Sequence, residues 1–563
     1  MSWIRAIAVD LDGTIATDDV IAPEVLDAIK HAQYRGVRML LVTGRTIAAL
    51  RTGFPGPIED FDAVVAENGG VLMVDGRHRL LADPVNPSLI QALLGQGIPL
   101  QQGEVLVGLS ADHDVAALHE ITRLGLDSTL LRNRGQLMIL PTGVSKGAGL
   151  LIALAGFGLS AHNTLAVGDA ENDHSMFEIA ELAAAPPNAL PAVKDHADLI
   201  LQAANGQGVA ALLTGQLVAG EIRPHSARRQ IRIGECSDGS DAQVSTIAST
   251  ILLVGGSGRG KSYLAGVVAE QLIDHAYQIL VIDPEGEQAG LAATAGVTSI
   301  TVKGEADITQ AVETIRAGSS VVLDLSSTER CQQSALLSVL ATPILALRAE
   351  TGAPQWVIID EAHELAGPTG PLRALFDPTA GGHCLVTYHP EQLSAEVLNS
   401  ADVIISASPP IDQVLGTVNV SAAGLPKAVT GQAMLMRTDR AEAGQPFMVA
   451  TRITKHQRHQ RKYAELCLPT GRGFRFRPFQ GHQLPEARTI DQFSAQLDQI
   501  DPDTLGWHMQ RGDLSKWLCE VVQDRQLGDH VAQLERDLTL RQLAEVQRAK
   551  EELATAIADR YIG

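Results

Sequence analysis

The sequence predicts an α/β protein that ends in a small, mainly helical domain. Three observations lead to this expectation. Strand-like and helix-like blocks alternate over residues 1–215, a second αβ series occupies residues 246–450, and apolar residues recur at i, i+3, i+4 spacing after Leu497. Because strands that alternate with helices form parallel, doubly wound sheets, we expect two α/β domains joined by a linker over 216–245 and followed by helices over 451–563.

Composition narrows the class of protein. Of the 563 residues, 45% are hydrophobic and 19% are charged, which is typical of a folded globular chain. The net charge of -21 opposes DNA binding over the whole surface but allows a local basic channel, and the aromatic content of 4% argues against dominant base stacking. We find no secretory pattern, no cysteine spacing typical of a metal site and no apolar run near the roughly 20 residues of a membrane span. We therefore expect the chain to be cytoplasmic and without a membrane partner.

The first domain opens with a regular αβ rhythm. Its first strand, helix, strand and helix are expected at Ile4–Val9, Pro23–Arg35, Arg38–Val42 and Thr46–Thr52. Residues of about 75–140 break the rhythm and predict an inserted α/β cap. The rhythm returns at Lys146.

Two carboxylates follow the first strand in the run Asp10-Leu11-Asp12-Gly13-Thr14. Asp10 ends the strand and Gly13 permits a tight turn, so the carboxylates project from the carboxyl edge of the sheet, where such folds bind ligands. Side chains at i and i+2 can share one cation and one phosphate. One of them can attack phosphorus while the other moves protons.

Three more blocks follow in a consistent order. Thr43 closes the second strand with a hydroxyl, Lys146 starts a later helix, and Asp169 and Asp173 follow another apolar strand. Any one block is most simply a turn or a loop. Four blocks in order at strand ends indicate a phosphate-handling site.

Over residues 1–215 these blocks resemble the haloacid dehalogenase superfamily, in its sugar-phosphatase branch. The resemblance implies a Rossmann-like core with a small cap, similar to that of phosphoglycolate-type phosphatases. It implies that Asp10 is the nucleophile that forms an aspartyl phosphate and that Asp12 is the general acid and base. It also implies that Thr43 hydrogen-bonds a phosphate oxygen and that Lys146 neutralises charge.

The same resemblance implies a Mg²⁺ site. Asp169 and Asp10 hold the ion together with the backbone carbonyl of Asp12, and Asp173 supports them. Magnesium suits a shell of oxygen ligands completed by water and phosphate. The substrate is then a phosphorylated small molecule or a nucleotide.

The cap does not identify that substrate. Arg132 and Arg134 can contact a second anionic group of a ligand, although solvated surface is the better expectation for both.

Residues 216–245 carry several arginines and then Gly-, Ser- and Asp-rich sequence, which we interpret as a linker or a small β element. Apolar strands of the second domain are expected at Ser249–Val254, Gln278–Ile282, Ser320–Leu325, Trp356–Ile359, His383–Thr387 and Val403–Ser406.

A phosphate-binding loop lies between the first of these strands and a helical stretch, and this context makes the motif specific. The residues expected to contact nucleotide are Gly256, Ser257, Gly258, Arg259, Gly260, Lys261 and Ser262. Lys261 reaches the β- and γ-phosphates, and Ser262 offers its hydroxyl to Mg²⁺. Asp360 ends a later strand and organises Mg²⁺ through water, and Glu361 is the candidate base that orients the attacking water.

Residues 245–450 resemble the HerA/FtsK class of P-loop ATPases. The resemblance rests on Asp283-Pro284-Glu285-Gly286, Asp360-Glu361-Ala362-His363, Thr387-Tyr388-His389-Pro390 and Gly431-Gln432-Ala433-Met434. It implies a RecA-like core, ATP as substrate and a homo-oligomeric ring, most simply a hexamer. The chain departs from the class at the sensor position, where Tyr388 and His389 replace glutamine, and in lacking the N-terminal barrel of HerA.

The sequence does not decide between two interpretations for the arginine finger or for the basic run that follows the ATPase domain. Arg348, Arg373 and Arg437 are candidates for an arginine finger, and each is more simply an ordinary surface arginine. The basic run over residues 455–462 is most simply a solvated helix face, and nucleic-acid contact is its minority interpretation.

The leading functional hypothesis is a Mg²⁺-dependent phosphomonoester phosphatase fused to a ring-forming ATPase. This hypothesis includes a role in DNA processing or prokaryotic defence. The alternative is a metabolic sugar- or glycolate-phosphate phosphatase whose ATPase domain is a nucleotide-sensing scaffold. A third, a non-enzymatic assembly protein, is disfavoured by the intact Asp10 and Glu361.

Overall fold

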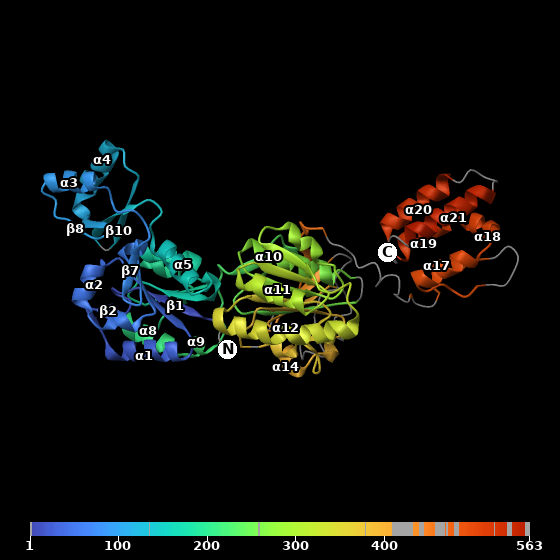
Figure 1. Cartoon of the computed structure of the whole chain (residues 1–563), viewed down its shortest axis with the longest axis horizontal. Helices are drawn as coiled ribbons and strands as arrows, with labels where there is room; N and C mark the ends of the chain where they lie inside the picture. Colours follow the sequence, from blue (N-terminus) through green and yellow to red (C-terminus); the bar gives the residue numbers. More distant parts are fainter. Residues whose placement is uncertain are drawn as a thin grey trace. The chain divides into compact units, whose positions relative to one another are not determined.

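The computed structural model of the chain separates into two compact units, Met1–His456 and Gln457–Gly563 (Figure 1). The residues it describes are 3–133, 135–256, 259–377, 379–407, 432–438, 444–455, 468, 471–477, 484–522, 524–537 and 543–557. The predicted fold class, two α/β domains and then helices, is confirmed.

The N-terminal domain is built on a sheet with the strand order β14-β13-β12-β1-β4-β5-β6-β7. Its strands are β1 (Ala6–Val9), β4 (Arg38–Val42), β5 (Ala63–Ala66), β6 (Val71–Val74), β7 (Arg77–Leu80), β12 (Thr164–Val167), β13 (Leu182–Ala185) and β14 (Leu199–Ile200). Strands β14 to β5 are parallel, and β6 and β7 continue the sheet as an antiparallel hairpin.

Helices cover both faces of this sheet. They are α1 (Pro23–Tyr34), α2 (Ile47–Gly53), α5 (Lys146–Gly156), α6 (His174–Ile179), α7 (Pro191–His196), α8 (Asn205–Thr214) and α9 (Gln216–Ala219). Alternate residues of β1 enter opposite cores, Ile7 and Val9 with α1 and α8, and Ala6 and Ala8 with α5 and α6. This two-sided burial explains why the strand reads as a continuous apolar run.

The cap lies between β7 and α5. It consists of an antiparallel sheet in the order β10-β11-β9-β8 and two helices. These elements are α3 (Pro87–Gly95), β8 (Gln101–Gln102), β9 (Val107–Ser110), α4 (Asp114–Leu124), β10 (Ser128–Asn133) and β11 (Gln136–Pro141). A separate small core closes it.

The second α/β domain has the strand order β16-β15-β25-β24-β23-β17-β22-β21-β18-β20-β19 in the part of the chain that is described. Its strands are β15 (Gln230–Cys236), β16 (Asp241–Ser245), β17 (Thr250–Val254), β18 (Ile279–Asp283), β19 (Val297–Thr301), β20 (Ser320–Asp324), β21 (Trp356–Ile359), β22 (His383–Thr387), β23 (Val403–Ser406), β24 (Gln432–Arg437) and β25 (Gln445–Val449). Its helices are α10 (Lys261–Asp274), α11 (Glu305–Arg316), α12 (Arg330–Thr351), α13 (Ala362–Leu365) and α14 (Ala395–Asn399).

The segment expected to be a linker or a small β element, residues 216–245, is structured. It contains α9, and its strands β15 and β16 belong to the second sheet because β15 pairs with β25. The apolar residues Ile231, Ile233 and Val244 are buried there, and this burial holds the segment against the sheet.

Helix α12 corrects one sequence expectation. Its stretch Gln332–Thr351 is long and apolar enough to cross a membrane, judged by length and composition alone, although no apolar run of that length was expected. In the structure Leu337, Leu340, Ile344 and Leu347 of this helix are buried in the core of the second domain. Their core packing accounts for the apolar character of the helix.

The two α/β domains meet at the amino ends of their strands. Arg5, which precedes β1, donates through Nε and Nη2 to the backbone oxygen of Arg348, at 3.2 and 3.1 Å. Gln355, which precedes β21, donates through Nε2 to Oδ1 of Asn163, which precedes β12, at 2.8 Å. We call this contact region the seam. The carboxyl ends of β1, β12 and β21 all point away from it.

The second unit is helical, with α17 (Ile490–Gln499), α18 (Pro502–Gln510), α19 (Asp513–Glu520), α20 (Arg525–Asp537) and α21 (Leu543–Ile557). Phe474, Phe476, Phe493 and Trp517 pack together in its core. Most of the basic run over 455–462 lies outside the described residues.

Candidate active sites

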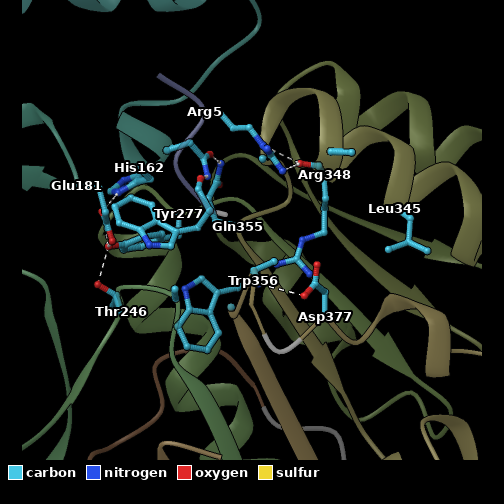
Figure 2. A pocket seen from close by; sticks show the side chains of 17 residues that line it. Arg5, His162, Glu181, Thr246, Tyr277, Leu345, Arg348, Gln355, Trp356 and Asp377 are labelled. Carbon is cyan, nitrogen blue, oxygen red and sulfur yellow. Dashed lines mark hydrogen bonds and ion pairs between the residues drawn. The ribbon is translucent and has the colours of Figure 1, made fainter. Parts of the chain in front are cut away.

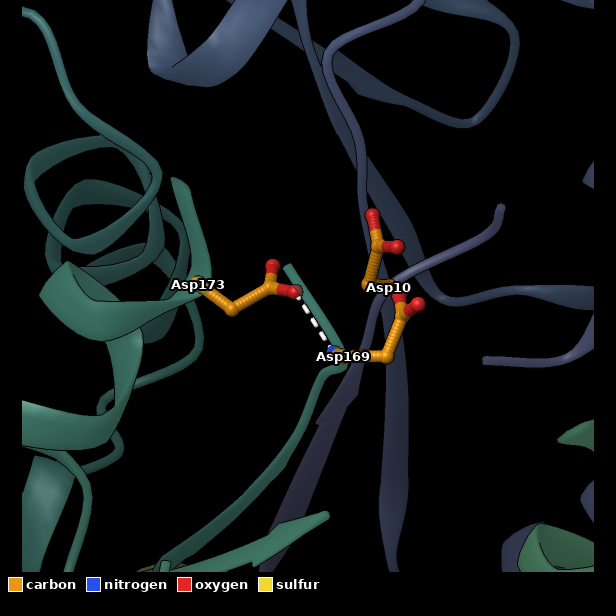
Figure 3. Close-up of side chains that lie close together, drawn as sticks. All are labelled: Asp10, Asp169 and Asp173. Atoms are coloured by element: carbon orange, nitrogen blue, oxygen red, sulfur yellow. Dashed lines mark hydrogen bonds between the residues drawn. The ribbon is translucent and has the colours of Figure 1, made fainter. Parts of the chain in front are cut away.

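Three carboxylates gather at the carboxyl edge of the first sheet. Asp10 follows β1 and Asp169 follows β12, and these strands are parallel neighbours, so their ends meet. One oxygen each of Asp10, Asp169 and Asp173 lies within 4.8 Å of the others, and all three residues are buried (Figure 3). The hydroxyl of Thr14 donates to Oδ1 of Asp169 at 3.0 Å.

Lys146 lies inside this cluster. It is the first residue of α5, whose N-cap is Ser145, and it is 1% exposed. Its Nζ donates to Oδ1 of Asp10 at 2.5 Å and to Oδ1 of Asp173 at 2.6 Å. The structure thus brings together residues that lie 136 positions apart in the sequence.

The electrostatics of the cluster follow from burial. Burial raises the pKa of Asp10 well above its ordinary value; Lys146 opposes this rise, and Asp173 and Asp169 add to it. Burial alone disfavours the charged form of Lys146, but Asp10 and Asp173 outweigh it and raise the pKa of the amine. A second, divalent cation is therefore favoured beside the carboxylates.

The donor set fits Mg²⁺, which prefers carboxylate oxygen at about 2.1 Å and keeps several waters. Oδ2 of Asp173 accepts from the backbone N–H groups of Asp169 and Ala170, at 2.8 and 2.9 Å, and its Oδ1 accepts from Lys146. Since both oxygens of Asp173 are engaged, Asp10 and Asp169 are the better direct ligands. Asp173 is suited to hold the loop that carries Asp169.

Asp12 lies differently from the buried cluster. Its carboxylate is about half exposed and is held by Arg45, whose Nε and Nη2 donate to Oδ2 and Oδ1 at 2.8 and 2.6 Å. Arg45 also pairs with Asp19. The sequence motifs alone predicted no role for Arg45. Its position two residues after Thr43 was the available signal.

Thr43 is fully buried at the end of β4. Its hydroxyl accepts from the backbone N–H of Arg45 at 3.2 Å, and its carbonyl accepts from that of Asn68 at 3.0 Å. Thr43 therefore fixes the loop that carries Arg45.

A cavity of about 620 Å³ lies between this edge and the cap. Asp10, Asp12 and Arg45 line its core side. The cap contributes amide side chains, apolar side chains and one glycine, which sequence reasoning did not identify: Gln101, Gln102, Leu106, Gly108, Asn133, Gln136, Leu137 and Met138. Arg132 is exposed and pairs with Asp114, and Arg134 lies outside the described residues.

The second site begins with the loop after β17. Gly260 has a φ of 92°, which an L side chain rarely adopts, and α10 begins directly after it at Lys261. Nζ of Lys261 donates to the backbone oxygen of Gly256 at 3.1 Å. Arg259 is exposed, and the expected phosphate contacts Ser257 and Gly258 lie outside the described residues.

Asp360 and Glu361 follow β21 at the same edge. Strand β22 separates β17 from β21, and all three are parallel, so the phosphate-binding loop and the acidic pair share one side of the sheet. Both residues are buried, and Oδ1 of Asp360 accepts from the N–H of Glu361 at 2.9 Å. Glu361 has a φ of 49°, an unusual conformation for a residue with a side chain.

Tyr388, at the expected sensor position, and His363 lie close to both parts of this site. The ring of Tyr388 lies 5.7 Å from Nζ of Lys261. His363 contacts the Tyr388 ring edge-on at 4.5 Å between centroids, and its Nδ1 lies 3.6 Å from Oε2 of Glu361.

The three candidates for an arginine finger differ in burial and in their contacts. Arg348 is 8% exposed, so the surface interpretation is wrong for it; it donates to the carbonyl of Gly381 and contacts His383 at the seam. Arg373 is exposed, and Arg437 donates to the backbone oxygen of Gln243.

The first domain matches a family of known proteins. Residues 7–99 and 117–213 match the model of the haloacid dehalogenase-like hydrolases. A phosphoglycolate phosphatase of Methanothermobacter thermautotrophicus is 32% identical over 216 residues, which are 96% of that protein and 37% of this chain. The chain belongs to the haloacid dehalogenase-like hydrolases.

A second curated relative of this hydrolase supports the assignment. A phosphoglycolate phosphatase of Methanopyrus kandleri is 32% identical over 226 residues, which are 93% of that protein and 36% of this chain. A solved structure of a haloacid dehalogenase-like hydrolase from Bacteroides thetaiotaomicron aligns with 20% identity and a TM-score of 0.33, covering 37% of this chain and 98% of that one.

Residues 231–329 of the hydrolase match the model of the central domain of helicase HerA. The match begins within β15 and extends past the start of α10, so β17 and the phosphate-binding loop both belong to the matched region. The chain is therefore a fusion of a phosphatase domain and a HerA-type ATPase domain, and it is an enzyme.

Proposed function

We propose that the first domain hydrolyses phosphomonoesters through a phosphate ester of Asp10. The observation that carries this proposal is the cluster of Asp10, Lys146, Asp169 and Asp173 beneath a 620 Å³ cavity. A carboxylate oxygen of Asp10 attacks phosphorus, and the bond from phosphorus to the leaving oxygen breaks. Lys146 stabilises the negative charge of Asp10 and of the phosphate.

Asp12 moves the protons. In the first step it donates a proton to the leaving oxygen, and in the second it removes a proton from the water that attacks phosphorus. Phosphate leaves, and Asp10 and Asp12 return to their starting states. Asp10, Asp169 and the backbone carbonyl of Asp12 would hold Mg²⁺, which when bound would supply positive charge for the phosphate oxygens.

The substrate class is tested by measuring phosphate release from a panel of 2-phosphoglycolate, sugar phosphates and nucleotides, with and without ATP and DNA. 2-Phosphoglycolate belongs in the panel because of the names of the relatives. If phosphate is released only from metabolites and neither ATP nor DNA changes the rate, the metabolic alternative is favoured.

We expect Arg45→Met to lower kcat by roughly 10- to 100-fold while KM changes less, since Arg45 holds the proton-transfer group Asp12 rather than the phosphate. The pH profile of kcat should also shift. Steady-state kinetics from pH 5 to 9 measure both effects. Arg51→Met, an exposed arginine on α2, is the matched control. A wild-type kcat and pH profile in Arg45→Met would exclude this role.

We propose that the second domain binds and hydrolyses ATP at the loop that precedes α10. In this proposal Lys261 contacts the β- and γ-phosphates, and Ser262 and Asp360 hold Mg²⁺ directly and through water. Glu361 orients the attacking water. The shared sheet edge of β17 and β21 supports the proposal.

A homo-oligomeric ring, most simply a hexamer, is proposed for this domain. The likeness to HerA motivates it. Arg348 is buried at the seam and is not available as an arginine finger, which leaves Arg373 and Arg437 as candidates. Light scattering with and without ATP should give a mass near six times the 59.7 kDa of the chain. A monomer under both conditions would contradict the ring.

DNA is a further proposed ligand of the ATPase domain. With a net charge of -21, binding has to come from a local surface and should fall steeply as salt rises, because counterions are released. We expect duplex DNA at low salt to stimulate ATP hydrolysis more than phosphate-ester hydrolysis. A flat ATPase response across a DNA titration would leave the domain as a regulator or scaffold.

A further inference from the structure

A second cavity, of about 220 Å³, lies in the seam (Figure 2). Residues of both α/β domains line it. Since a cavity of roughly 150 Å³ holds benzene, this space suits a molecule with one or two small rings. We call it the seam pocket. Nothing proposed above for either active site uses it.

Much of the wall is apolar. Trp3 from the phosphatase domain and Leu345, Ala349 and Trp356 from the ATPase domain contribute flat or aliphatic surfaces. Trp3 and Trp356 are 7% and 1% exposed, so the aromatic walls are built into the cores on either side. The walls favour a ligand with a flat, apolar body.

One end of the pocket is lined by polar side chains that hydrogen-bond to one another. Figure 2 shows His162, Glu181, Thr246 and Tyr277 together at this end. The Tyr277 hydroxyl lies 2.8 and 2.9 Å from the two oxygens of Glu181, and Nδ1 of His162 lies 2.8 Å from Oε2. The negative charge of Glu181 also has Arg229 beside it, at 3.6 Å. This end therefore offers little charge to a ligand.

The opposite end is cationic. Arg5 and Arg348 are 7% and 8% exposed, and Asp377 is the acidic residue beside them in the lining. Arg348 donates to the carbonyl of Gly381 at 2.7 Å and contacts Nε2 of His383 at 3.0 Å, and Arg5 donates to the carbonyl of Arg348. These acceptors are neutral, and burial lowers the pKa of Arg5 and lowers that of Arg348 to about 10.

Two buried guanidinium groups beside one carboxylate leave a positive potential, and an anion would reduce the cost of burying them. A planar carboxylate matches the fork of a guanidinium, whereas a dianionic phosphate calls for more donors than two engaged arginines supply. We propose that the seam pocket binds a small organic carboxylate with a flat apolar body. Because residues of both domains line the pocket, the ligand would stabilise their contact.

The test uses the full chain and isothermal titration with benzoate and indole-3-carboxylate, against the neutral benzamide and indole-3-carboxamide. We expect saturable one-site binding of a carboxylate with a Kd below roughly 1 mM, and at least about tenfold weaker binding of its amide. The same titration on Asp10→Asn/Lys261→Ala should give the same Kd. This result would separate the seam pocket from both phosphate sites, so the test does not depend on the proposed function.

Two variants locate the binding. Ala349→Phe fills the pocket without removing a charge and should abolish carboxylate binding, whereas Ala346→Phe, an exposed position on the same helix, should not. Arg348→Gln should weaken carboxylate binding at least about tenfold and leave amide binding unchanged. If Arg348→Gln fails to fold, Ala349→Phe still decides the question. Absence of saturable binding up to about 10 mM, equal binding of the amides, or unchanged binding by Ala349→Phe would overturn the proposal.

Discussion

Asp10→Asn is expected to lower phosphatase kcat by on the order of 10⁴-fold, because an amide cannot form the phosphate ester on which the proposed mechanism depends. The change is nearly isosteric. Lys146 keeps Asp173 as a partner at 2.6 Å, so the buried amine is not left alone and the fold should persist. Phosphate release from the best substrate of the panel, followed under saturating Mg²⁺, measures the loss.

Two controls accompany this prediction. Asp27→Asn removes an exposed carboxylate from α1 of the same domain and should retain full activity. ATP hydrolysis by Asp10→Asn should also match the wild type, since its site is on another sheet. Phosphatase turnover within about tenfold of wild type in Asp10→Asn would remove Asp10 from the nucleophile role.

Glu361→Gln is expected to lower the rate of ATP hydrolysis by at least roughly 10²-fold while ATP binding is kept. The substituted group is buried beside Asp360 at the edge that carries Lys261, so glutamine keeps the shape but loses the basic oxygen. ATP should therefore stay bound to this variant. Single-turnover hydrolysis and retention of labelled ATP on the protein measure the two effects.

Glu364→Gln is the matched control, since Glu364 lies in the short helix α13, which Glu361 caps at its N-terminus, but is exposed and pairs with Arg330. Lys261→Ala should instead weaken nucleotide binding. Hydrolysis at the wild-type rate in Glu361→Gln would mean that another group activates water.

Much of the fold follows from local sequence. The expected strands Trp356–Ile359, His383–Thr387 and Val403–Ser406 coincide with β21, β22 and β23. These strands could be predicted from the sequence because parallel strands buried on both faces are uniformly apolar and end at polar residues. The first domain was readable for the same reason, as β4 shows.

The edge of the second sheet was less predictable. Strand β15 alternates buried and exposed residues and is completed by β25, where Gly234 pairs with Val449. A pairing across more than 200 positions leaves no local pattern. The burial of Arg348 was equally hidden, because its acceptors on Gly381 and His383 come from another segment of chain.

Part of each candidate site could be predicted from the sequence and part could not. The carboxylates and Lys146 were expected from their motifs, and the structure brings Asp10, Lys146 and Asp173 into contact. The pairing of Asp12 with Arg45 and the amides of the cap could not be derived, because they depend on how side chains turn and on how the cap lies over the core. Neither is encoded in a short spacing.

Because the two sheets meet at their amino ends, a product cannot pass directly through the contact region from one proposed active site to the other. The edges that carry Asp10 and Asp360 face away from the seam, so a product released at one proposed site would enter bulk water before it could reach the other. The mechanical connection is short, however, because β1 and β21 each span four residues, roughly 13 Å, between the seam and these carboxylates. Each strand therefore has one end at the contact between the domains and the other at a proposed active site.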